Sequence, residues 1–250
     1  MPAVTHEDHD AAGELARLAG QLLVGLRESM GFADPAALRA AGDRKANDLL
    51  VAALAERFPG DGVLSEEAPS GPERLDLARV WIVDPLDGTR EFGEEGRTDW
   101  AVHVALTLDG DPVAGAVALP ARSLVLSTAA PAVAPAPASP LRIAVSRSRP
   151  PALCDEVASS LGATLVPMGS AGAKVMAVVL GDADVYLHAG GQYEWDSCAP
   201  VAVARAAGLS ATRIDGAPLR YNTADAWLPD LLVCRPELLD RVLGAVAAAG

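Results

Sequence analysis

Two aspartates that follow a predicted buried strand are the residues of this 250-residue chain whose types and spacing most clearly indicate chemistry. The apolar run at 80–83 predicts the strand, and Asp84 and Asp87 come after it, three residues apart. Around a tight turn both carboxylates can converge, and they repel each other unless a cation lies between them. Oxygen ligands suit Mg²⁺, whereas Zn²⁺ favours the His and Cys ligands that this segment lacks. The spacing indicates a Mg²⁺ site, with capping of a turn as the alternative for the two aspartates taken alone.

The residues that follow these acids suit a phosphate group. Pro85 stiffens the turn, and Gly88 allows the backbone to approach a ligand closely. If a helix begins near Gly88 and Thr89, its free N–H groups would receive a phosphate. The whole string is therefore far more specific than the spacing of the two aspartates.

Four further acids lie where elements are predicted to begin or end. Glu66 and Glu67 follow a short strand at 63–65, and Asp196 precedes a helix at a natural N-cap position. Asp43 stands at the predicted start of another helix. Taken singly, Asp43 and Asp196 are explained by helix capping, because a carboxylate accepts from the free N–H groups there.

The composition excludes several classes of protein. The formal net charge is −13, so we do not expect nucleic-acid binding, since phosphate backbones need Lys and Arg. No apolar run reaches the ~18 residues of a membrane span, and the N-terminus lacks the cationic stretch and apolar core of a secretory signal. We therefore expect no membrane partner and a cytoplasmic location. The three cysteines lie far apart, which predicts free, buried thiols rather than disulfides.

Helix and strand patterns show which elements must position these side chains. The first half is predicted to hold two helices and an antiparallel sheet. Its helices are expected at 5–30 and 43–58, and its antiparallel strands at 99–108, 113–119 and 124–127, in addition to 63–65 and 80–83.

The second half alternates strand and helix more regularly. Strands are predicted at 141–145, 164–167, 184–188 and 231–234, and helices at 151–161, 171–180, 197–207 and 236–249. The Ala- and Pro-rich segment 129–140 is expected to link an N-terminal α+β half (1–128) to a C-terminal α/β half (141–250) within one catalytic unit. The predicted class is α/β in layers, with an antiparallel sheet and helices followed by a mixed sheet and helices.

The order of these motifs resembles the inositol monophosphatase superfamily over roughly residues 10–235. The resemblance is carried by three motifs, namely Glu66-Glu67, Asp84-Pro85-Leu86-Asp87-Gly88-Thr89 and Trp195-Asp196. It implies an αβαβα sandwich and a Mg²⁺-dependent, lithium-sensitive phosphomonoesterase. Three other features are most similar to the CysQ-type bisphosphate nucleotidase branch, namely Arg90-Glu91-Phe92 after Thr89, Gly169-Ser170 with Lys174, and the segment 216–221.

The resemblance also implies roles for individual residues. Glu66, Asp84 and the carbonyl of Leu86 would hold a first Mg²⁺, and Asp84, Asp87 and Asp196 a second. A third, weaker ion near Glu66 and replacement by Mn²⁺ are also compatible with the family. Thr89, hydrogen-bonded to Asp43, would orient the attacking water and help to deprotonate it.

The substrate side is less well defined by the sequence. The N–H groups of Gly88 and Thr89 would hold the phosphate, while Arg90, Ser170, Lys174 and Arg220 are candidates for a second phosphate or a sugar. Trp100, Tyr193 and Trp195 could stack on a base, although packing is the simpler explanation. His103 lies within a strand with no evident partner, and His188 is interpreted as structural.

The function that the resemblance implies is hydrolysis of the 3′-phosphate of adenosine 3′,5′-bisphosphate to AMP and phosphate, with the sulfated form as a second substrate and a link to sulfate assimilation. The alternative is an inositol-1-phosphate or fructose-1,6-bisphosphate phosphatase with the same metal core. A non-catalytic nucleotide- or metal-sensing module is disfavoured, because the complete set of ligands and Thr89 are present. The resemblance further implies a homodimer.

Overall fold

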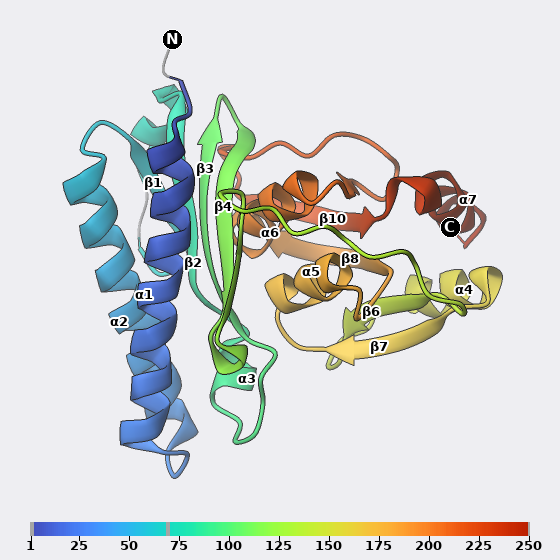
Figure 1. Cartoon of the computed structure of the whole chain (residues 1–250), viewed down its shortest axis with the longest axis horizontal. Helices are drawn as coiled ribbons and strands as arrows, with labels where there is room; N and C mark the ends of the chain where they lie inside the picture. The colour runs from blue at the N-terminus through green and yellow to red at the C-terminus, as the bar shows by residue number, and fades with distance from the viewer. Residues whose placement is uncertain (1–2, 69–70, 250) are drawn as a thin grey trace.

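The structure is a computed structural model that describes residues 3–68 and 71–249. Two helices cover one face of the first sheet, α1 (His6–Met30) and α2 (Pro35–Arg57) (Figure 1). The prediction that α2 begins at Asp43 is wrong, because Asp34 caps the helix by accepting from the N–H of Ala37 at 3.0 Å. Pro35 then takes the first helical position, where its missing N–H costs nothing. Asp43 therefore lies in the third turn of α2.

The first sheet has the strand order β1-β2-β3-β4-β5. Its strands are β1 (Gly62–Ser65), β2 (Arg79–Asp87), β3 (Ala101–Leu108), β4 (Asp111–Leu119) and β5 (Leu124–Ser127). Pairing is antiparallel from β2 to β5, but β1 runs parallel to β2, so the prediction of a purely antiparallel sheet is wrong. The segment 66–78, which includes the 3₁₀ turn η1 (Pro72–Asp76), is long enough to return the chain for a parallel pair.

The second sheet is mixed, as predicted, with the order β7-β6-β8-β10-β9. Its strands are β6 (Arg142–Ser146), β7 (Thr164–Met168), β8 (Val185–Tyr193), β9 (Ser210–Thr212) and β10 (Trp227–Cys234). β6 pairs parallel with β7 and β8, while β10 pairs antiparallel with β8 and β9. The three-residue strand β9 was not predicted.

The remaining helices complete five layers, which confirms the αβαβα sandwich (Figure 1). α5 (Ala171–Leu180) and α6 (Glu194–Ala206) lie between the sheets, and α4 (Ala152–Leu161) and α7 (Leu239–Ala249) cover the outer face of the second sheet. The short turns are α3 (Thr89–Phe92), η2 (Pro120–Arg122) and η3 (Pro236–Leu238). No helix among the described residues combines the length and apolar character needed to cross a membrane.

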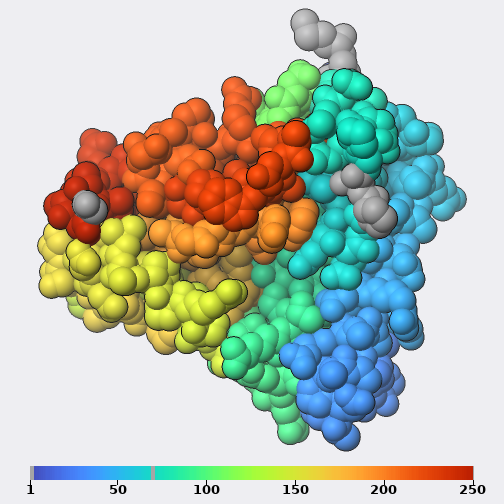
Figure 2. Space-filling view, turned by 180° about the vertical axis from the view of Figure 1, so that it is seen from behind, coloured from blue at the N-terminus to red at the C-terminus, as the bar shows by residue number. Residues whose placement is uncertain are grey.

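The two sheets come from separate stretches of the chain, and their halves lie side by side in space (Figure 2). α6 packs closely on β4, since a Cβ at Gly115 would lie 2.9 Å from the Cβ of Ala202. Arg147 joins the halves through ion pairs to Glu91 (2.7 Å) and Glu94 (2.8 Å). The predicted loop 129–140 forms no helix or strand, and the division at 128 and 141 stays a prediction. All three cysteines are free and buried.

Candidate active site

Three carboxylates converge where β2 ends and α6 begins. Asp84, Asp87 and Asp196 each offer an oxygen that lies within 4.8 Å of the others. Asp84 is buried, and its Oδ1 accepts from the N–H of Leu86 at 3.0 Å, whereas its Oδ2 has no hydrogen-bond partner among the described residues. A buried carboxylate oxygen without a donor is costly, and a cation would relieve that cost. The donor set is made of oxygens alone, which suits a hard ion such as Mg²⁺.

The local folding explains this convergence. The register of β2 against β3 shifts between Asp84 and Asp87, at Pro85-Leu86, which re-aims the second carboxylate. The prediction that Asp196 is the N-cap residue is wrong. Asp196 lies in the first turn of α6, where its Oδ2 accepts from the N–H of Tyr193 at 2.6 Å. The cap residue is Tyr193, because β8 runs directly into the helix.

Glu66 lies next to this cluster because β1 is parallel to β2. The pairing of Ser65 with Val83 brings the two strand ends together. Burial, followed by the negative charges of Asp196 and Asp87, raises the pKa of Glu66 to about 7. Its carboxylate is outside the close group of three, which is compatible with a second ion beside the first.

Charge is unevenly distributed over the cluster. Burial and the charges of Glu66 and Asp87 raise the pKa of Asp84 well above its ordinary value. Burial and the charge of Asp87 raise the pKa of Asp196 to about 6. Burial also acts to raise the pKa of Asp87, but the charge and hydrogen bonding of His103 outweigh it and lower that pKa to about 2. Asp87 is therefore the anionic centre of the metal-free site.

Asp87 is held by the C-terminal half. Its carboxylate accepts from the Oγ of Ser170 (2.5 Å) and from the N–H groups of Ala171 (3.1 Å) and Gly172 (2.6 Å), at the start of α5. His103 Nε2 lies 3.2 Å from Asp87 Oδ2. A Cβ at Gly172 would lie 2.0 Å from that nitrogen, so glycine lets the helix approach the imidazole.

His103 also faces α6, since its Nδ1 lies 3.0 Å from the carbonyl oxygen of Trp195. No partner for His103 was predicted, because Asp87 reaches it through the pairing of β2 with β3 and Trp195 lies on α6, far along the chain. The feature that could have revealed its partners is the antiparallel register of β2 and β3, which places His103 opposite Asp84.

Thr89 and Asp43 form the second part of the site. The Oγ1 of Thr89 lies 3.4 Å from Asp43 Oδ1 and 3.0 Å from the carbonyl oxygen of Leu86. Gly42 lets α2 reach this position, because a Cβ there would lie 2.8 Å from a ring carbon of Phe92. Burial and the charge of Glu67 raise the pKa of Asp43 to about 6, against the opposing hydrogen bond from Thr89. Asp43 is thus suited to accept a proton near neutral pH.

Asp87, Thr89 and Asp196 line a cavity of about 730 Å³ at the junction of the two halves. Gly88 lines it with a φ of +84°, and a Cβ there would lie 3.1 Å from Ser170 Cβ and 3.3 Å from the Asp99 carbonyl oxygen. The volume suits a small organic ligand. Its walls come from β2–α3, the start of α5, β8, the start of α6 and the start of β10.

A sequence model of the inositol monophosphatase family matches residues 10–134 and 136–247. The chain belongs to the inositol monophosphatase family. It is 54% identical over 243 residues to the 3′-phosphoadenosine 5′-phosphate phosphatase of Mycobacterium bovis, which covers 92% of this chain and 90% of that protein. It is 31% identical over 237 residues to the 3′(2′),5′-bisphosphate nucleotidase CysQ of Escherichia coli K12, with 88% and 96% covered.

A solved structure agrees with this membership. CysQ from Bacteroides thetaiotaomicron matches with a TM-score of 0.78 and 26% identity, over 92% of this chain and 97% of that chain. The predicted family and the predicted enzyme class, a phosphoric monoester hydrolase, are therefore confirmed.

The cationic candidates of this family member differ in their positions. Lys174 lines the cavity but is buried, and its Nζ donates to the carbonyl oxygen of Ser170 at 2.7 Å. Burial lowers the pKa of its amine. Arg90 lies at the exposed rim and pairs with Glu94 at 3.3 Å. The prediction that Arg220 is a candidate for substrate binding is wrong, because Arg220 pairs with Asp111 at 2.9 Å and does not line the cavity.

Other residues that line the cavity were not predicted as site residues. Arg149, Gln192 and Trp227 belong to them, and Tyr193, which was considered for stacking, lines it too. Lone residues before or after an apolar run carry no distinctive spacing, so no sequence signal marked them.

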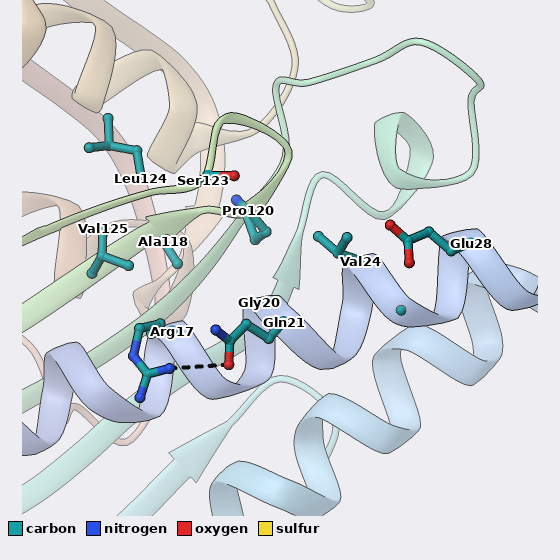
Figure 3. A pocket seen from close by; sticks show the side chains of 11 residues that line it. Arg17, Gly20, Gln21, Val24, Glu28, Ala118, Pro120, Ser123, Leu124 and Val125 are labelled. Carbon is teal, nitrogen blue, oxygen red and sulfur yellow. Dashed lines mark hydrogen bonds between the residues drawn. The ribbon is translucent and has the colours of Figure 1, made fainter.

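A second cavity, of about 380 Å³, lies between α1 and the strands β4 and β5 (Figure 3). Arg17 donates to Gln21 at 3.1 Å beside it, and the remaining lining is largely apolar. Glu28 is its only acid, so this cavity holds no cluster comparable with Asp84, Asp87 and Asp196.

Proposed function

We propose that this protein is a Mg²⁺-dependent phosphatase that removes the 3′-phosphate of adenosine 3′,5′-bisphosphate, giving AMP and phosphate. The observation that carries the proposal is the unpartnered, buried Oδ2 of Asp84 within a group of three converging carboxylates, of which Asp87 and Asp196 line the cavity. Two named relatives act on such nucleotides, which supports this choice of substrate. A homodimer, a cytoplasmic location and a link to sulfate assimilation stay predictions.

The metal ligands in this proposal are Glu66, Asp84, Asp87, Asp196 and the carbonyl oxygen of Leu86. All are oxygen donors, and the raised pKa values of Glu66 and Asp196 reflect burial and, after it, like charges that a divalent ion would offset. The chemistry that Mg²⁺ supplies at such a site is stabilisation of negative charge on phosphate oxygens and easier deprotonation of water. The negative charge of about four carboxylates balances the positive charge of two divalent ions, and a bound phosphate adds further negative charge.

The protein's own groups would then move the proton. The single proton of the Thr89 hydroxyl can be donated to Asp43 or to the Leu86 carbonyl, and in either case the oxygen lone pairs can accept from a water. As the water attacks phosphorus, Thr89 takes its proton and passes its own proton to Asp43. The bond between phosphorus and the 3′-oxygen breaks on the opposite side, and the 3′-oxygen keeps its electron pair and takes a proton from solvent water to become the hydroxyl of AMP. The backbone N–H groups of Gly88 and Thr89 would hold the phosphate, with Ser170 and Lys174 beside it and Arg90 at the rim.

Phosphate release tests the substrate assignment. Adenosine 3′,5′-bisphosphate, inositol-1-phosphate and fructose-1,6-bisphosphate are compared at equal low concentration with Mg²⁺. We expect kcat/KM for the nucleotide to be at least about tenfold higher, which is about 1.4 kcal/mol of transition-state discrimination. Equal or faster hydrolysis of either other ester would overturn the nucleotide assignment and leave the metal site intact.

A further inference from the structure

Gln192 is a buried amide without a partner. Its side chain lines the same cavity as the acidic cluster and is only 8% exposed. Neither its Oε1 nor its Nε2 has a hydrogen-bond partner among the described residues. Buried amides are nearly always hydrogen-bonded, because losing water without a replacement is unfavourable. Both atoms are also enclosed by neighbouring atoms, so the amide must turn toward the cavity to meet a ligand, and the ligand would then supply the missing bonds.

The backbone before Gln192 is shaped to present it. Gly190 and Gly191 have φ values of +112° and +95°, and the register between β8 and β10 is shifted there. Such bulges re-aim side chains and are frequent beside active sites. His188 Nε2 lies 2.9 Å from the Gly191 carbonyl oxygen, which fixes the bulge. A Cβ at Gly190 would have no atom within 4 Å, so open space adjoins this wall.

Two exposed aromatic rings line the same part of the cavity. Trp227 is 47% exposed, and Gly191 gives it room, since a Cβ there would lie 2.6 Å from the indole nitrogen. Tyr193 is 48% exposed, and its ring stacks on Trp195 at 4.8 Å with an interplanar angle of 9°. Flat exposed rings beside an open space favour a flat ligand group over a cyclic polyol.

We propose that Gln192 is a specificity-determining residue that reads the edge of the adenine base. Its carbonyl oxygen accepts from the 6-amino group, while its amide N–H donates to the adjacent ring nitrogen. Adenine presents this donor and acceptor side by side, and an amide matches both at once. Trp227 or Tyr193 stacks on the face of the same base. This inference rests on the proposed function, because it requires a nucleotide in the cavity.

Binding of the product tests the contact without relying on turnover. Calorimetry compares AMP with purine riboside 5′-monophosphate, which lacks the 6-amino group, in wild type and in Gln192→Leu, with Mg²⁺ present. We expect wild type to bind AMP about tenfold more tightly than the purine analogue, equal to about 1.4 kcal/mol. We expect Gln192→Leu to bind the two ligands equally, because leucine fills the space without hydrogen-bonding groups.

Two further variants sharpen the result. Gln192→Glu keeps the size but replaces the amide N–H by an oxygen, so it should also lose the preference for AMP. Gln21→Leu changes the chain's only other glutamine, on α1 beside the second cavity, and should keep the full preference. The melting temperature of Gln192→Leu should equal or exceed that of wild type, since the change removes an unsatisfied buried amide.

Failure of this inference and failure of the proposed function give different results. If wild type hydrolyses adenosine 3′,5′-bisphosphate preferentially but Gln192→Leu still prefers AMP about tenfold, the contact with the base is refuted. Equal weakening of both ligands, or a lowered melting temperature, would likewise refute it in favour of a structural role. If wild type shows no preference for the nucleotide in phosphate release, the proposed function itself fails.

Discussion

The two ends of the main cavity are built on opposite plans. At the acidic end Asp87 accepts three hydrogen bonds from the start of α5, and Asp196 accepts one from Tyr193. At the other end Gln192 lacks partners and Trp227 is half exposed beside a glycine bulge. The difference teaches that groups proposed to act on phosphate are positioned by the fold itself, whereas groups proposed to read the base are left for the substrate to complete.

The largest expected effect follows from removing one charge at the acidic end. Asp84→Asn should lower phosphate release by about a thousandfold or more, because several kcal/mol of charge stabilisation depend on the ligand set. The raised pKa of Asp84 shows that its charge is unfavourable in the metal-free fold. The same variant should therefore melt at a higher temperature than wild type without metal. Turnover and melting curves in a chelator measure both effects, and near-wild-type turnover of the folded variant would contradict the site.

A smaller loss is expected from the proton relay. Thr89→Val keeps the shape of the side chain but removes the hydroxyl that lies between Asp43 and the Leu86 carbonyl. We expect turnover to fall by about a hundredfold, the lower range for general base assistance. Thr89→Ser restores the hydroxyl and should recover most of the rate. If Thr89→Val and Thr89→Ser lose the same amount, packing rather than proton transfer explains the role of Thr89.

The other end of the cavity should respond in binding rather than in turnover. Trp227→Ala removes an exposed ring, and base stacking contributes about 1–3 kcal/mol, so KM for the nucleotide should rise by about tenfold. The kcat should change little, because the Trp227 indole makes no hydrogen bond to the acidic cluster among the described residues, and its backbone N–H donates to Asp225, outside that cluster. Steady-state kinetics separates the two constants. A tenfold fall in kcat at constant KM would contradict the contrast between the ends.

How far the sequence predicts this structure differs in the same way between the two ends. Asp84, Asp87 and Gly88 were predictable because one short string combines a strand, a turn and oxygen ligands. The placement of Asp43 within α2 was not predictable. The residues between the Asp34-Pro35 cap and Asp43 are mostly alanine and end in Gly42, so they show no clear apolar spacing that would mark the first turns of the helix. The pairing of His103 with Asp87 required the register of two strands, which composition does not give.

The end of the cavity that is proposed to read the base could not be predicted from the sequence, for a different reason. Gln192 matters here because both of its polar atoms lack partners in a buried position, and absence of a partner leaves no mark on the sequence. The Gly190-Gly191 pair was visible in the sequence, but a bulge there depends on pairing with β10, which lies some forty residues further along the chain.

The smallest expected effect is the pH dependence of stability that the raised carboxyl pKa values of the acidic end produce. In the metal-free protein the pKa values of Glu66, Asp43 and Asp196 are raised to about 7, 6 and 6. Between their ordinary values near 4 and these values, the folded state binds more protons than the unfolded state, so stability falls as pH rises. The melting temperature should therefore be a few degrees higher at about pH 5.5 than at about pH 8.

Controls assign this pH effect to one end. Mg²⁺ should raise the melting temperature most at the higher pH, because it binds the charged carboxylates, and so reduce the difference. Asp84→Asn should also reduce it, while Gln192→Leu should leave it as large as in wild type, since no titrating group is removed. A pH difference that survives Mg²⁺ and Asp84→Asn, or that disappears in Gln192→Leu, would mean that the two ends are not electrostatically independent.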